Sequence, residues 1–117
     1  MKYTVSLKGN RSFRRLYAKG RSLASGTVVL YCRRNGSREN RLGLTVGTKV
    51  GKAVVRNRVR RRFRELFRRN SGRFNGVYDV ILVGRTRAAD MDFARLERQY
   101  LSALEELGML LPEEGKS

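Results

Sequence analysis

The segment from Lys52 to Arg69 constrains the fold most, because its two sides make opposite demands on their surroundings. Its apolar residues recur at helical spacing and form one stripe, made of Val55, Val59, Phe63, Leu66 and Phe67. With Val59 pointing at a core, the turn of about 100° per residue defines the opposite side. That side carries Asn57, Arg61, Arg64 and Arg68. The sequence therefore predicts an amphipathic helix with one buried side and a dense row of arginines in solvent.

The charge of this helix is unbalanced, since Glu65 is the one acidic residue between positions 52 and 69. Like charges at i and i+4 destabilise an isolated helix by about 0.2–0.5 kcal/mol per pair. An ordinary solvated helix side mixes acidic and basic residues, which this one does not. Arginine also favours planar, bidentate contacts with phosphate. The pattern indicates a phosphate-bearing partner.

The whole chain repeats this signal, with 27 Lys and Arg against 10 Asp and Glu, a net charge of +17. Residues 1–48 have a net charge of +10, residues 49–73 +10, residues 74–87 +1 and residues 88–117 −4. Such an excess is typical of nucleic-acid-binding proteins. Membrane attachment would need an exposed apolar helix or a lipidation signal, and neither is visible. We expect an RNA partner, no membrane partner, and an RNA-binding face outside the C-terminal quarter.

The length of the chain and its cysteine content limit its domain organisation and its cellular location. At 117 residues the chain has room for one domain, predicted over residues 1–111, followed by an acidic, flexible tail at 112–117. Cys32 is the single cysteine and cannot form an internal disulfide. The first twenty residues contain no apolar run, and no stretch approaches the roughly 20 residues that cross a bilayer. We expect a cytoplasmic protein with no obligate protein partner.

The order of elements follows from periodicity and turn residues. Asn10 is expected to cap a helix over 11–19 that ends at Gly20, and two antiparallel strands follow at 27–33 and 41–47. After the helix at 52–69, residues 77–84 form a buried strand, and Asp92 caps a last helix that ends at Gly108. The predicted order is α-β-β-α-β-α, with room for a short extra strand near residues 3–7. The predicted class is α/β (α+β), with helices packed on a mixed sheet.

Three aromatic residues have two interpretations. Phe13 and Tyr17 lie on one side of the first predicted helix, and Tyr31 lies in the first predicted strand. All three could belong to the core. Tyrosine hydroxyl groups tolerate water, however, and an exposed ring offers a stacking platform for unpaired bases, worth about 1–3 kcal/mol per base.

The glycine-rich run before the long helix does not fit a nucleotide-binding P-loop, because Gly51-Lys52 lacks both the opening glycine and the following hydroxyl. Such a turn still presents free backbone N–H groups to phosphate at the start of a helix. Backbone phosphate of RNA is therefore a better ligand than a nucleoside triphosphate.

Residues for protein-borne catalysis are sparse. The chain has no histidine, and one cysteine is too few for a zinc knuckle. Asp90 and Asp92 stand where helix caps are common, so neither a catalytic residue nor a metal site is predicted. An autonomous nuclease using Asp79, Asp90 or Asp92 with a metal ion stays open as an alternative.

The run Arg-Leu-Gly-Leu-Thr-Val-Gly-Thr-Lys-Val-Gly-Lys-Ala-Val-Val-Arg-Asn-Arg-Val-Arg-Arg over residues 41–61 closely resembles the protein subunits of bacterial ribonuclease P. It includes the Arg-Asn-Arg signature of that family at Arg56, Asn57 and Arg58. Residues 13–20, the strand containing Tyr31, and Tyr78-Asp79-Val80 agree as well. The resemblance covers nearly the whole domain.

The resemblance implies a two-layer α/β sandwich with a left-handed βαβ crossover through the Arg-Asn-Arg helix, against the usual right-handed preference. It also implies a subunit of a ribonucleoprotein endoribonuclease, a hydrolase that removes the 5′ leader of precursor tRNA. In this family the RNA subunit carries out catalysis and uses Mg²⁺, and the protein holds no tightly bound cofactor. The implied partners are therefore the catalytic RNA and the 5′ leader.

Two sets of site residues follow from the resemblance. The side chains implied to bind the catalytic RNA are Lys52, Arg56, Asn57, Arg58, Arg60, Arg61, Arg64 and Arg68. Those implied to line a leader-binding cleft, between the first helix and the sheet, are Phe13, Tyr17, Tyr31, Thr48 and Lys49.

One departure concerns the cleft, because family members commonly carry Ser-Lys where this chain has Gly47-Thr48. A positive charge is missing there, while Thr48 keeps a hydroxyl group.

The net charge of the chain alone would equally suit a non-catalytic ribosomal or RNA-packaging protein, which is the second alternative.

Overall fold

The computed structural model describes residues 4–7 and 9–112, so most of the predicted tail lies outside the described residues. The elements along this part of the chain are β1 (Thr4–Ser6), α1 (Asn10–Lys19), β2 (Arg21–Ala24), β3 (Val28–Arg34), β4 (Asn40–Thr45), α2 (Ala53–Asn70), β5 (Tyr78–Gly84) and α3 (Phe93–Glu106). Single 3₁₀ turns stand before α2 (Thr48–Val50), after it (Ser71–Arg73) and after β5 (Thr86–Ala88). Within the described ranges, no helix combines the length and apolar character that crossing a membrane requires.

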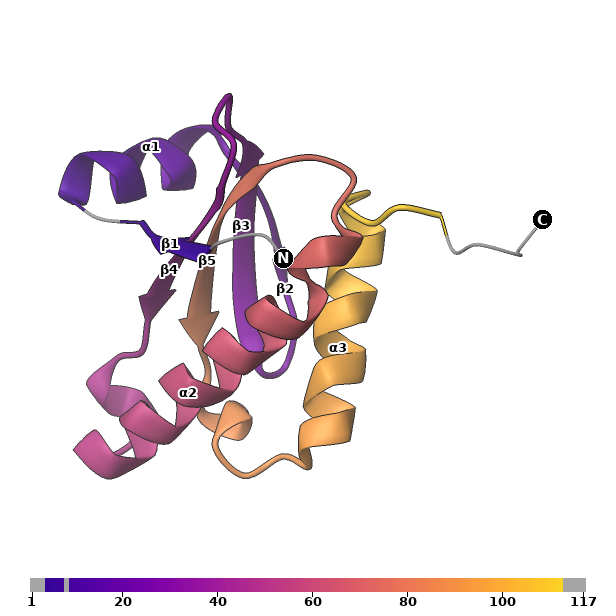
Figure 1. Cartoon of the computed structure of the whole chain (residues 1–117). Coiled ribbons are helices and arrows are strands. Elements are labelled where there is room, and N and C mark those ends of the chain that lie inside the picture. The colour runs from indigo at the N-terminus through magenta and orange to yellow at the C-terminus, as the bar shows by residue number, and fades with distance from the viewer. Residues whose placement is uncertain (1–3, 8, 113–117) are drawn as a thin grey trace.

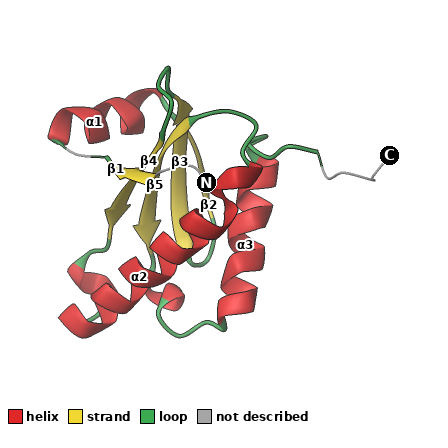
Figure 2. Ribbon diagram, viewed as in Figure 1, coloured by secondary structure: helices red, strands yellow, loops and turns green. Residues whose placement is uncertain are grey.

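The strands form one mixed sheet in the order β1-β4-β5-β3-β2 (Figure 2). β5 runs parallel to β4 and antiparallel to β3. The two strands expected after α1 do run in opposite directions, but β5 lies between them. The last strand along the chain is therefore the centre of the sheet, and its residues Tyr78, Val80, Ile81 and Leu82 are all buried.

The connection from β4 through α2 to β5 is left-handed. In Figure 1 both strands point downward, α2 crosses in front of the sheet, and β5 lies to the right of β4. A right-handed connection seen this way would place β5 to the left. The predicted fold class, a mixed sheet with a left-handed crossover, is confirmed.

The main core lies between the sheet and the helices α2 and α3, which cover the same face (Figure 1). α2 contributes the predicted stripe, with Val59, Phe63, Leu66 and Phe67 buried and Val55 partly buried. α3 contributes Leu96, Tyr100 and Leu104, and the strands contribute Leu30, Val80 and Leu82. Burying these side chains, each worth about 1.5–3 kcal/mol, offsets the repulsion along the arginine side of α2.

The other face of the sheet is covered only in part, by α1. Leu16 packs with Leu7 and Ile81 in a second small cluster, and Phe13, Tyr31 and Val83 border it. Beside α1, the residues Val29, Tyr31, Thr45 and Val83 of this face are only partly buried. The predicted leader-binding cleft would lie here.

Four details of the secondary structure correct, extend or confirm the prediction. The expected capping role of Asn10 is wrong, because Gly9, with φ of 88°, occupies the cap position and Asn10 is the first helical residue. The extra strand near residues 3–7 exists as β1. β2 was missed, since its one large apolar residue, Leu23, gives no alternation on an otherwise exposed edge strand. The Asp92 cap is confirmed by a bond of 3.3 Å from the Arg95 N–H to Oδ2.

Candidate RNA-binding surfaces

The outer side of α2 lies in solvent as its periodicity predicts. Lys52, Asn57, Arg58, Arg61, Arg64 and Arg68 are exposed, and Arg56 and Arg60 are half-buried. All eight side chains predicted to contact the catalytic RNA therefore reach the surface, and they come from one helix and its cap.

Several of these guanidinium groups are held in place by partners close by. Arg60 Nη1 donates to Asn57 Oδ1 at 2.9 Å, and Arg56 Nε donates to the Gly51 carbonyl at 3.2 Å. Arg68 binds both carboxylate oxygens of Glu65, at 3.1 and 2.6 Å, which lowers the pKa of that carboxyl. A guanidinium group has five N–H donors, so each of these side chains keeps donors for phosphate.

Arg62 has a structural role that was not predicted. Its Nη1 donates to the carbonyls of Ala88 and Met91, at 3.2 and 2.5 Å. These bonds fix the turn after β5 against α2. The available signal was its place three residues after Val59, at the border of the buried stripe.

The start of α2 follows the glycine-rich turn as expected. Lys52 is the cap residue, its side chain makes no capping bond, and the first turn holds no acidic residue. Gly51 has φ of 153°, and a Cβ there would lie 2.9 Å from Val55 Cβ, so the turn into the helix requires glycine. The positive end of the helix dipole is thus left without a side-chain acceptor.

The predicted aromatic residues of the cleft converge, although they come from two elements. Phe13 and Tyr17 on α1 have ring centroids 6.2 Å apart, and Tyr17 and Tyr31 of β3 are 4.7 Å apart, both edge-to-face. Tyr17 is 40% exposed and its hydroxyl lies 3.4 Å from Thr45 Oγ1. Tyr17 is therefore exposed to solvent and Tyr31 is partly buried beside it, an arrangement that could offer a stacking surface to unpaired bases.

Thr48 and Lys49, the other two predicted cleft residues, lie in the 3₁₀ turn beyond the end of β4 and are exposed. Within residues 4–7 and 9–112, no hydrogen bond joins their side chains to the three aromatic residues. The structure thus brings together three of the five predicted leader-binding residues and leaves two beside the entry to α2.

Basic residues that were not predicted stand at one end of the cleft. Arg15, Arg33 and Arg41 line a small polar pocket of about 90 Å³ together with Asp79. Arg33 follows Tyr31 by two positions, and Arg41 precedes Gly43 and Thr45 by two and four. Period-two alternation places such residues on one sheet face, so the signal was present in the sequence.

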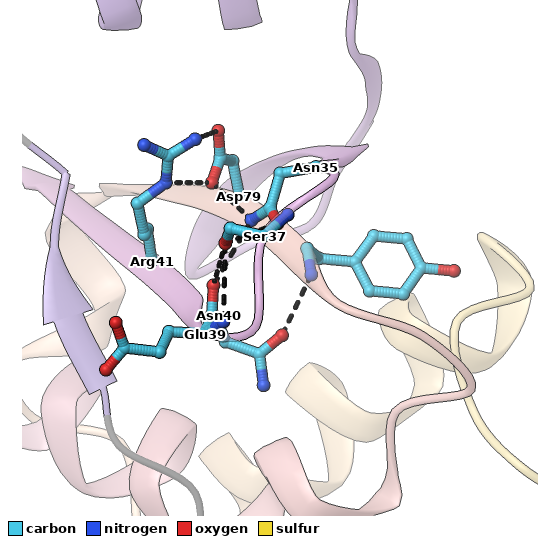
Figure 3. Close-up of polar contacts among 7 residues, drawn as sticks. Asn35, Ser37, Glu39, Asn40, Arg41 and Asp79 are labelled. Carbon is cyan, nitrogen blue, oxygen red and sulfur yellow. Dashed lines mark hydrogen bonds and ion pairs between the residues drawn. The ribbon is translucent and has the colours of Figure 1, made fainter.

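An ion pair fixes this end of the sheet (Figure 3). Arg41 Nε and Nη2 donate to the two oxygens of Asp79, at 2.7 and 2.8 Å, and Asn35 Nδ2 donates to Asp79 Oδ1 at 2.7 Å. Asn40 Oδ1 accepts from the Tyr78 N–H at 2.8 Å. The β3–β4 connection is thereby bound to β5.

The carboxylates considered for an autonomous nuclease each have another partner. Asp79 is paired with Arg41, Asp92 caps α3, and Asp90 lies 3.7 Å from Arg58. Across the described ranges, no three His, Cys, Asp or Glu side chains form a group that could hold a metal ion.

Comparison with known proteins decides the family, since the model of the Ribonuclease P family matches residues 1–108. The chain belongs to the ribonuclease P protein family. The ribonuclease P protein component of Natranaerobius thermophilus is 38% identical over 101 residues, covering 86% of this chain and 88% of that protein. The one from Alkaliphilus oremlandii is 36% identical, covering 94% and 96%.

Solved structures agree with the family assignment. The ribonuclease P protein of Staphylococcus aureus matches with a TM-score of 0.79 and 31% identity, covering 91% of this chain and 97% of that one. That of Thermotoga maritima matches with a TM-score of 0.77 and 32% identity, covering 86% and 96%. This chain is thus the protein component of an endoribonuclease holoenzyme that contains ribonuclease P RNA and matures the 5′ ends of tRNA.

Proposed function

We propose that this ribonuclease P protein binds its RNA partners on two separate surfaces. The outer side of α2, with Lys52, Arg56, Asn57, Arg58 and Arg61, contacts the catalytic RNA. The cleft between α1 and the sheet takes the single-stranded 5′ leader of precursor tRNA, on Phe13, Tyr17 and Tyr31. Thr48 and Lys49 stand beyond the end of β4 to meet the strand where it leaves the cleft.

The observation that carries this proposal is the placing of the aromatic cluster. The rings of Phe13, Tyr17 and Tyr31 stand on the sheet face opposite the one that α2 covers. A folded RNA on the outer side of α2 therefore leaves the rings free for a flexible strand. Arg15 and Arg33 at the end of the cleft add positive charge for its phosphates.

The protein's share in the reaction is binding and orientation. Hydrolysis belongs to the RNA subunit, which uses Mg²⁺ ions, and arginine side chains lower the repulsion between the phosphates of the two RNAs. Less Mg²⁺ is then needed to bring substrate and catalytic RNA together. No protein side chain is assigned a catalytic role.

Reconstitution with a bacterial ribonuclease P RNA tests the proposal. The protein alone should leave precursor tRNA intact, and adding it to the RNA should restore cleavage at a Mg²⁺ concentration where the RNA alone is inactive. The complex should bind leader-bearing tRNA more tightly than mature tRNA. Cleavage by protein free of RNA, or equal affinity for the two tRNAs, would contradict it.

A further inference from the structure

A groove separate from the aromatic cleft runs between α1 and α2 across β4. Its volume is about 470 Å³, within the range of ligand-binding sites. Its lining is apolar on one side, with Leu7, Phe13 and Leu42, and basic on the other, with Arg60, Arg64 and Arg68.

The basic wall is a regular row along one side of α2. Arg60, Arg64 and Arg68 follow each other at intervals of four residues, which is about 6 Å along the helix axis. Arg60 is bound to Asn57 and Arg68 to Glu65, so the side chains at the two ends of the row are already ordered. Glu65 is the acidic residue beside this row, and it is bound to Arg68. Arg64, between Arg60 and Arg68, is exposed and has no hydrogen bond or ion pair to the described residues.

The apolar wall connects the groove to the aromatic cleft. Phe13 lines the groove and also contacts Tyr17, which in turn contacts Tyr31. Gly43 lets Phe13 lie across β4, because a Cβ at Gly43 would stand 2.6 Å from Phe13 Cζ. A strand seated on Tyr31 and Tyr17 can therefore pass over Phe13 without leaving the protein surface.

We propose that the 5′ leader continues from the aromatic cleft into this groove, with a base against Phe13 and Leu7 and its phosphates on Arg60, Arg64 and Arg68. This inference rests on the proposed function and adds to it. It reassigns Arg60, Arg64 and Arg68, which the family resemblance gives to the catalytic RNA, to the substrate strand. The other residues of α2 and its cap named in the proposed function stay with the catalytic RNA.

Several features favour a nucleotide strand as the occupant. An apolar wall facing a row of arginines complements a chain that alternates bases with phosphates. The three arginines span about 12 Å along the helix axis, whereas a single small anion would contact only one or two of them. Continuity with the Phe13 ring selects the leader over a loop of the catalytic RNA.

The test uses the reconstituted holoenzyme and precursor tRNAs whose leaders are extended one nucleotide at a time. The measured quantity is the gain in affinity from the shortest to the longest leader, so losses in catalytic-RNA binding cancel. We expect Arg64→Ala to reduce this gain about tenfold and Arg64→Lys to reduce it less.

Arg61→Ala is the matched control, because Arg61 is an exposed arginine of the same helix outside the groove. It should weaken binding of the catalytic RNA and keep the gain from leader extension. An unchanged gain in Arg64→Ala, an equal loss in Arg61→Ala, or no gain in the unaltered protein would each overturn the groove assignment. Cleavage of the shortest-leader substrate, restored by adding the protein to the RNA, tests the proposed function separately from the groove assignment.

Discussion

At the scale of single residues, Gly43 shows how one missing side chain shapes the cleft. This buried glycine of β4 lies beneath the Phe13 ring, and a Cβ in its place would stand 2.6 Å from Phe13 Cζ and 3.3 Å from Ile81 Cγ1. Phe13 belongs both to the aromatic cluster and to the groove. The position of one ring, and with it both proposed leader contacts, depends on this glycine.

Gly43→Ala should therefore displace the Phe13 ring and destabilise the protein by about 1–3 kcal/mol, the usual range for overpacking. Urea unfolding measures the free energy of unfolding directly. Gly47→Ala is the control, because a Cβ at Gly47 would meet nothing within 4 Å. Equal stabilities of the two variants would show that the sheet yields easily at this point.

Tyr100 is a buried residue whose hydroxyl has no hydrogen-bond partner in the described part of the chain. Burial strongly raises the pKa of this hydroxyl above its ordinary value of 10.0. The folded protein then keeps a proton that the unfolded chain releases above pH 10. The stability that depends on this proton is complete below that pH and falls as the pH rises, by up to about 1.4 kcal/mol per unit.

Tyr100→Phe should leave stability at pH 7 unchanged or raise it by up to about 1 kcal/mol, because it removes an unsatisfied polar group. It should also flatten the loss of stability above pH 10. Tyr78→Phe serves as the comparison, since the Tyr78 hydroxyl donates to Asn75 Oδ1 at 2.6 Å and its loss should destabilise. Unfolding curves at pH 7 and above pH 10 distinguish the two; a destabilised Tyr100→Phe would reveal a partner for the hydroxyl.

At the scale of the element, α2 is a helix that its own sequence does not favour. It carries eight arginines and one glutamate, no acidic residue in the first turn, and no side-chain cap. Its stability comes from the four buried apolar side chains that face the sheet and α3. The arginine-rich side can keep its unbalanced charge because the core holds the opposite side of the helix.

Phe63→Ala should thus destabilise the whole domain, by about 3–5 kcal/mol, since Phe63 is 1% exposed at the middle of the stripe. Val54→Ala, on the same helix at 73% exposure, should change stability by less than about 0.5 kcal/mol. Thermal and urea unfolding of both variants measures the difference. A small effect of Phe63→Ala would mean that α2 does not depend on the core.

At the scale of the whole molecule, charge is divided along the chain. Residues 1–73 have a net charge of +20, and residues 88–117, which include α3, have a net charge of −4. α3 packs beside α2 on one face of the sheet (Figure 1), and Glu97 binds Arg69 and Asn70 where the two helices meet. α3, whose own net charge is −1, therefore borders the basic helix α2 without covering its outer side.

Removing one positive charge should consequently have effects that depend on its place. Arg61→Ala should weaken binding of ribonuclease P RNA and lower the slope of log affinity against log salt by about 0.9, the value for one lost phosphate contact. Arg98→Ala, an exposed site on α3 with the same change in charge, should leave the slope unchanged. Equal slopes for the two variants would indicate that only net charge matters.

Much of this protein follows from local patterns in its sequence. The 3.6-residue period predicted α2 and its buried stripe to within one residue at each end, and Asp92 and Gly108 bounded α3 as expected. The excess of arginine indicated an RNA partner, and the run at 41–61 indicated the ribonuclease P family. These features depend on residue types and on neighbours along the chain, which a single sequence displays directly.

The tertiary structure decided which distant segments meet. The insertion of β5 between β3 and β4, the edge strand β2, and the meeting of Phe13 with Tyr31 all depend on long-range pairing, which leaves no periodic trace. The same holds for the division of the arginines of α2 between an outer side and a groove, because the neighbours of Arg60, Arg64 and Arg68 come from β1, α1 and β4. Periodicity fixes which way a side chain points relative to its own helix, and only packing determines what it faces.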